Sequence, residues 1–184
     1  MVLQQNVVVV YLVHKSTIFS FKNHTMITTL NSIGLEVSFS NDLAHKLNLL
    51  LADYQIFYQN ARGFHWNIKG DDFFELHLKF EELYNDLKIK IDEIAERILT
   101  IGFTPTHTYT DYLADSTIQE IKGVSNGKEA IGSILHSFQT IIVKQRELLN
   151  LSGKANDEGT NALMSDYIRE QEKLVWMYSA YLGR

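Results

Sequence analysis

Cysteine is absent from the 184-residue sequence, and proline occurs only once, at Pro105. Without cysteine the chain has no disulfide framework, no thiolate metal site and no cysteine nucleophile, a composition that suits the cytoplasm. Because a proline inside a helix costs ~3 kcal/mol, its scarcity favours an all-α protein, as do the abundant Leu, Ile, Glu and Lys. A hydrophobic fraction of 45% over this length suits one compact domain.

Basic residues are scarce near the start of the chain. The formal net charge is -5, and the first 40 residues contain only Lys15 and Lys22 as basic residues. DNA binding through a basic tail is therefore weakly supported, although a nucleoid-associated location stays open. The apolar run at residues 7–13 is too short to span a bilayer and lacks the flanks of a secretory signal, so we predict no membrane segment.

Residues 1–25 do not follow the pattern of the rest of the chain. They are rich in β-branched residues and are separated from the first helical pattern by a mixed polar stretch. We interpret them as a disordered or spurious N-terminal extension, followed by one domain at residues 26–184. The intact mass of the natively produced protein tests this hypothesis, and a mass that includes Met1 or Val2 would contradict it.

Apolar residues recur at helical spacing in four long segments. The first is capped by Ser40 or Asn41 and ends near Asn67, and the others cover residues 71–101, about 128–151 and about 156–181. The expected inward residues of the last segment are Leu163, Tyr167, Ile168, Leu174, Val175 and Tyr178. Residues 103–127 form a long crossover with room for one short helix near residue 112. This order is typical of a ferritin-like four-helix bundle.

Five residues with metal-binding side chains, His65, His77, Glu81, Asp92 and Glu96, form the most informative pattern. His77 and Asp92 are roughly 22 Å apart along one helix, whereas a metal needs its donors within roughly 2 to 2.2 Å. At ~100° per residue, the four members on that helix share one stripe beside its apolar face. A second copy running antiparallel about a two-fold axis would make two complete sites between subunits. Imidazole and carboxylate together accept iron, manganese, cobalt or zinc.

A simpler interpretation assigns these carboxylates no function. Asp92 and Glu96 could be solvated, or they could pair with Lys88 or Arg97. The protein would then be a purely structural helical oligomer that holds no iron above background.

Two stretches and the residues between them resemble a known family. The first is HWNIKG from His65 to Gly70, the second is DEIAER from Asp92 to Arg97, and Phe73, His77 and Glu81 lie between them. In these motifs, and in the spacing of 12 between the two histidines, the chain from about residue 27 onward resembles the Dps family. These small ferritins are also called DNA-binding proteins from starved cells.

The resemblance implies a hollow dodecamer that oxidises Fe²⁺, preferably with hydrogen peroxide, and stores ferric mineral as protection against oxidative stress. It selects iron from the metals left open above. It also implies that His65, His77 and Glu81 of one subunit share a catalytic di-iron site with Asp92 and Glu96 of its two-fold mate. Glu81 stands where the family often has aspartate, which leaves the occupancy of the second iron position open.

Further roles follow from the same resemblance. Trp66, beside His65, is a candidate radical sink, although an aromatic residue there is more often packing. Asp157, Glu158 and Asp166 are candidates for an iron-entry pore, although acidic residues near a helix N-terminus are also favoured by its dipole. The competing function is a nucleoid-compacting DNA-binding protein with little oxidase activity.

Overall fold

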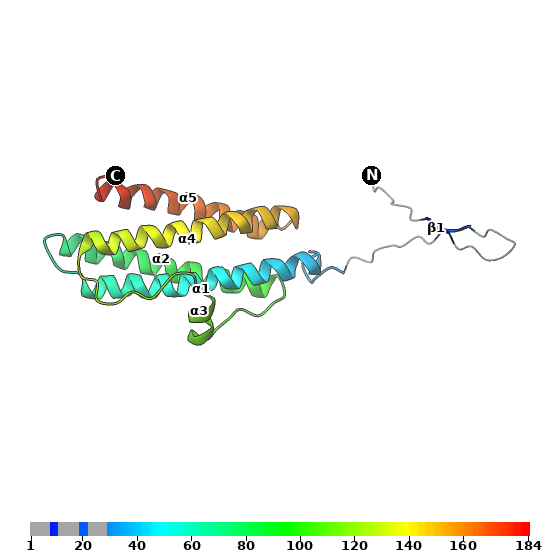
Figure 1. The fold of residues 1–184 in the computed structure, drawn as a ribbon, viewed down its shortest axis with the longest axis horizontal. Helices are drawn as coiled ribbons and strands as arrows, with labels where there is room; N and C mark the ends of the chain where they lie inside the picture. Colours follow the sequence, from blue (N-terminus) through cyan, green and yellow to red (C-terminus); the bar gives the residue numbers. More distant parts are fainter. Residues whose placement is uncertain (1–7, 11–18, 22–28) are drawn as a thin grey trace.

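Four long helices run side by side along the main body of the computed structural model, which describes residues 8–10, 19–21 and 29–184 (Figure 1). They are α1 (Val37–Asn67), α2 (Phe73–Thr100), α4 (Gly127–Lys154) and α5 (Glu158–Tyr181). The short helix α3 (Tyr109–Asp115) lies in the crossover from α2 to α4 and packs against α1. These helices confirm the predicted all-α bundle with a long crossover and an extra helix.

Most of the predicted N-terminal extension lies outside the described residues. Within it, strand β1 (Val8–Val10) pairs antiparallel with strand β2 (Phe19–Phe21), and Val9 lies opposite Ser20. The boundary between residues 25 and 26 therefore stays a prediction.

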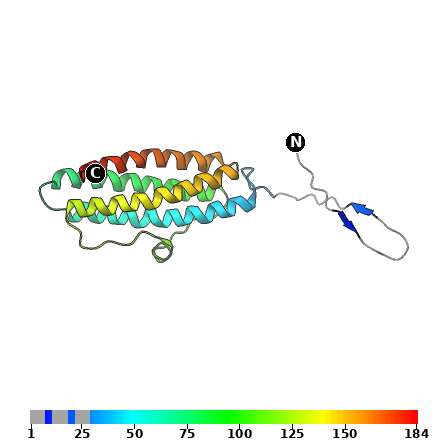
Figure 2. The same cartoon turned by 45° about the horizontal axis from the view of Figure 1, so that its top comes forward.

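The core forms where α1 packs against α2 and α4, and where α4 packs against α5 (Figure 2). The apolar positions of α1 that repeat at helical spacing are all buried, as are most of those on α2 and α4. Helix α5 is different, because Tyr167 is the only buried member of its predicted inward set. Leu174 and Tyr178 are half-buried, since this face of α5 borders a seam with α2.

The predicted N-cap of the first helix, Ser40 or Asn41, lies four or five residues after the observed N-cap, Glu36. Helix α1 begins at Val37, because the Asn31 side chain accepts hydrogen bonds from the backbone N–H groups of Ile33 (3.1 Å) and Leu35 (2.9 Å) and organises the preceding turn. Ser40 is not a cap: it is buried, and its hydroxyl donates to the Glu36 carbonyl at 3.0 Å. The turn chemistry of Asn31 decides where the helix begins.

The crossover is held by two buried polar residues of α1. Asp53 is fully buried, pairs with Lys144 of α4, and accepts a hydrogen bond from the Thr117 N–H at 2.7 Å. Asn60 accepts from the Ile121 N–H at 3.0 Å and donates from its side chain to a carbonyl of the same segment. Together they satisfy backbone groups that the irregular chain could not pair by itself.

The described helices include none that is both long enough and apolar enough to cross a membrane.

Candidate metal centre

His65 and His77 meet where α1 ends and α2 begins, because only a short turn separates the two helices. Their imidazole rings stack with centroids 3.8 Å apart and an interplanar angle of 21°. His65 Nδ1 donates to the His77 carbonyl at 2.8 Å, and His77 Nδ1 donates to the His65 carbonyl at 2.9 Å. The His65 carbonyl is free to accept because it lies in the last turn of α1, where carbonyl groups lack partners within the helix.

This reciprocal pair of hydrogen bonds fixes the tautomer of both rings. A carbonyl oxygen can only accept, so in the neutral ring each Nδ1 carries the proton and each Nε2 has the lone pair. In metal-binding histidines the nitrogen that does not bind the metal is commonly held in this way, which orients the ring and raises its basicity. The donor chemistry of His65 and His77 therefore fits a divalent metal at Nε2.

Aromatic side chains surround the two histidines. Phe73 stacks on the other face of His77 at a centroid distance of 5.1 Å, and Tyr84 meets His65 edge to face at 5.3 Å. The Tyr84 hydroxyl also approaches Glu81 Oε1 at 3.5 Å, and Glu81 is half-buried. Desolvation first, and then the Glu81 carboxylate, raise the pKa of Tyr84. Tyr84 was missed in the sequence, although its position three residues after Glu81 places it on the same helix face.

Asp92 and Glu96 lie far from the histidines along α2. Both are exposed, and neither forms an ion pair with any residue of the part of the chain that the structure describes. Arg97, one of the partners that the simpler interpretation offered, pairs with Asp157 instead. Among residues 29–184, no three His, Asp or Glu side chains are grouped closely enough to hold a metal ion. One chain thus brings His65 and His77 together but keeps Asp92 and Glu96 apart from them.

Trp66 lies on the surface beside this site. Its side chain is 58% exposed, and the Arg62 guanidinium lies over its ring at 4.6 Å from the centroid. Arg62 also lies over Tyr58 at 5.3 Å, so the cation links two aromatic rings. A role for Trp66 in intercepting radicals stays a prediction.

The three predicted pore residues have different environments. Asp157 is 2% exposed, accepts from the Thr160 N–H at 3.0 Å as the cap of α5, and pairs with Arg97. Its carboxylate is therefore engaged inside its own chain. Glu158 and Asp166 are exposed on α5, where Asp166 pairs with Arg169 at 2.9 Å, and the pore role of the three residues stays a prediction.

Comparisons with known proteins agree with this fold. Residues 44–184 match a ferritin-like domain. The DNA protection during starvation protein of Porphyromonas gingivalis is 44% identical over 135 residues, which cover 73% of this chain and 85% of that protein.

Solved structures of Dps proteins also match this chain. The crystal structure of the Dps protein from Vibrio cholerae O1, a member of a broad superfamily of ferritin-like diiron-carboxylate proteins, matches with a TM-score of 0.82 and 53% identity over 83% of this chain and 96% of that one. A Dps protein from Bacillus brevis matches with a TM-score of 0.77 and 33% identity over 80% of this chain and 99% of that one. Fold, motifs and sequence identity together show that this chain belongs to the Dps family of ferritin-like proteins.

Proposed function

We propose that this protein oxidises Fe²⁺ and stores the ferric product inside a hollow homododecamer, with hydrogen peroxide as the preferred oxidant. Each oxidation site holds two iron ions as substrate and lies between two subunits related by a two-fold axis. Consumption of both Fe²⁺ and peroxide protects the cell against oxidative stress. The observation that carries this proposal is the reciprocal hydrogen bonding of His65 and His77, which leaves both Nε2 atoms available to a metal.

The remaining ligands are the carboxylates on the same stripe of α2. Glu81 follows His77 by one helical turn, whereas Asp92 and Glu96 lie 15 and 19 residues further on than His77 and are exposed without ion-pair partners in residues 29–184. An antiparallel neighbour would bring its Asp92 end against the His77 end of the first subunit. The similarity to Dps proteins supports a homo-oligomeric assembly, in which such a dimer would be one unit.

Reduction of one peroxide molecule to water requires two electrons, which must be delivered at one site. Two Fe²⁺ ions supply them to one peroxide molecule, which takes up two protons and leaves as two water molecules, so hydroxyl radical is not released. The protein's own part is to position the ions and to surround them with negative charge. Glu81 keeps a carboxylate one methylene longer than the aspartate common in the family, and this residue governs how firmly the second iron is held.

Anaerobic loading of the purified particle with Fe²⁺, followed by stoichiometric peroxide, tests the proposal. We expect rapid oxidation with about one peroxide consumed per two Fe²⁺, because two electrons reduce one peroxide. Iron should then remain with a particle whose mass corresponds to twelve subunits. A particle that holds no iron above background would instead be the purely structural oligomer.

DNA retardation is expected to be small. At physiological salt the acidic protein, with a formal charge of -5, should shift little duplex DNA in a gel, because nonspecific affinity depends on neutralised phosphates. A shift at micromolar protein that survives 150 mM salt would instead support nucleoid compaction.

A further inference from the structure

Helices α2 and α5 face each other across a seam that polar side chains bridge at both ends. At one end Arg97 Nε donates to Thr160 Oγ1 at 2.9 Å, and the same guanidinium pairs with Asp157. At the other end the Tyr181 hydroxyl donates to Asp72 Oδ2 at 2.5 Å. These contacts join the two helices at both ends of the seam.

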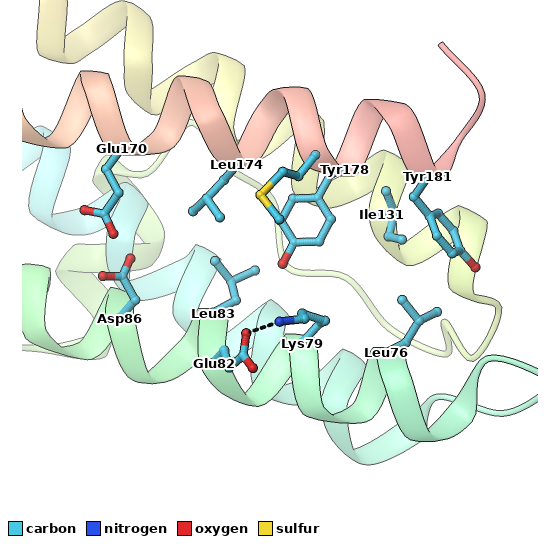
Figure 3. Close-up of a pocket in the computed structure, with 11 residues that line it drawn as sticks. Leu76, Lys79, Glu82, Leu83, Asp86, Ile131, Glu170, Leu174, Tyr178 and Tyr181 are labelled. Carbon is cyan, nitrogen blue, oxygen red and sulfur yellow. Dashed lines mark hydrogen bonds and ion pairs between the residues drawn. The ribbon is translucent and has the colours of Figure 1, made fainter.

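A pocket of about 330 Å³ lies in this seam, toward its Tyr181 end (Figure 3). Three helices contribute its apolar walls: Leu76 and Leu83 of α2, Ile131 of α4, and Leu174 and Tyr178 of α5. In Figure 3 the side chains of Leu174 and Tyr178 point from α5 toward Leu83 on α2. The volume lies at the lower end of the range of roughly 300 to 1,000 Å³ found for small-molecule sites. The pocket therefore suits a small, largely apolar molecule.

Charged groups line one side of the pocket. Asp86 of α2 and Glu170 of α5 are directed toward each other across the seam (Figure 3). Lys90, only 4% exposed, pairs with Asp86 and lies 2.9 Å from Glu170 Oε2. Lys79 pairs with Glu82 at 2.6 Å. The three carboxylates of Asp86, Glu170 and Glu82 thus face the two ammonium groups of Lys90 and Lys79. One formal negative charge remains at the pocket.

Asp86 is the carboxylate whose hydrogen bonding is incomplete. Lys90 engages Oδ1, whereas Oδ2 is buried and has no hydrogen-bond partner among the described residues. Burial raises the pKa of Asp86, and Lys90 only partly opposes that effect. A positively charged ligand group at the Asp86 carboxylate would offset the uncompensated negative charge at the pocket.

The arrangement favours an organic cation over a metal ion. The carboxylates near the pocket do not form a group of three that could converge on one ion in the described chain. Most of the lining is carbon from Leu, Ile and Tyr side chains, which offers a metal no ligands but offers an aliphatic or aromatic body a dry surface. A ligand with an apolar body and a cationic group would therefore contact both the apolar walls and the carboxylates of the pocket.

We propose that the pocket between α2 and α5 binds a small amphipathic amine, with its apolar body between Leu83, Ile131 and Leu174 and its ammonium group donating to Asp86. The ligand class is a primary alkyl or arylalkyl monoamine. None of these residues belongs to the proposed iron site, so the inference does not depend on iron oxidation.

Calorimetric titration of the intact purified particle with three probes of equal chain length tests the proposal. We expect the affinity for hexylamine to be at least about tenfold higher than that for 1-hexanol, because only the amine can form a charge-assisted hydrogen bond. Hexanoate should bind most weakly. Equal affinity for the three probes, preference for hexanoate, or no binding of hexylamine would overturn the inference.

Two variants locate the site. Leu174→Phe fills the pocket and should weaken the binding of hexylamine and of 1-hexanol alike. Asp86→Asn keeps the shape of the pocket and should lower the affinity for hexylamine to that for 1-hexanol. Glu75→Ala, which removes an exposed carboxylate of α2 outside the pocket, is the matched control and should change nothing. Unchanged hexylamine binding in Leu174→Phe would contradict the proposed location, even if Asp86→Asn fails to fold.

Discussion

Peroxide-driven oxidation of Fe²⁺ is expected to fall at least about tenfold when His77 is replaced by alanine, since loss of an outer-shell partner alone costs that much at a metal site. His77→Ala removes one Nε2 donor, and it also removes the imidazole stacked 3.8 Å from His65. His65→Ala and Asp92→Ala should show losses of the same order. Stopped-flow absorbance after anaerobic loading measures the rate.

Glu75→Ala is the control for these variants. Glu75 is an exposed carboxylate in the first turn of α2, about 160° around the helix from His77 at ~100° per residue. We expect its rate to equal that of the wild type. Wild-type rates in His77→Ala, with a particle of unchanged mass, would remove the site assignment.

Mixed particles can show that the ligands come from two subunits. One subunit carries His65→Ala with His77→Ala, the other carries Asp92→Ala with Glu96→Ala, and each is inactive by itself. Coexpression in equal amounts should restore about a quarter of the wild-type rate, because half of the dimers are mixed and each mixed dimer regains one of its two sites. If all five ligands acted within one subunit, the mixed particles would stay inactive.

Asp53→Ala is expected to lower the free energy of unfolding by about 3 to 5 kcal/mol, the usual cost of removing one partner of a buried ion pair. Asp53 is fully buried, and its loss leaves the Lys144 ammonium and the N–H group of Thr117 without their acceptor. The crossover would then detach from α1 more readily. Urea unfolding followed by circular dichroism measures the effect.

The matched control for Asp53→Ala is an exposed ion pair on the same two helices. Lys46 of α1 and Glu147 of α4 lie 2.9 Å apart, with their side chains 42% and 55% exposed. Because water solvates both ions, Glu147→Ala should cost at most about 1 kcal/mol. Equal losses in the two variants would show that Asp53 has no special role in holding the crossover.

The helices could be predicted from sequence because their apolar residues repeat at 3.6-residue spacing, a local property of the chain. The buried residues Leu47, Tyr54 and Phe57 of α1 follow this pattern. The start of α1 could not be predicted as well, because Asn31 organises a turn before the helix and Ser40 uses its hydroxyl within it. Side chains such as Ser have several local hydrogen-bonding options, and the surrounding structure selects one.

The burial of Asp53 is not visible in any local pattern either. It lies among apolar residues of α1, and its partners are more than 60 residues away in the sequence. An acidic residue is usually exposed, so residue type alone would predict that Asp53 is exposed. Only the path of the crossover along α1 brings the N–H groups of Thr117 and Ile118 to this carboxylate.

The sequence by itself determined the helical bundle, the family motifs and the distance along one helix that separates the two halves of the ligand set. These follow from residue type and spacing, which a helix converts into position at a fixed rise. Tertiary structure alone decided that His65 and His77 hold each other through their carbonyls, and that the seam between α2 and α5 contains a pocket with an incompletely bonded Asp86. Such contacts join residues far apart in the chain and depend on how the helices pack, which no local pattern specifies.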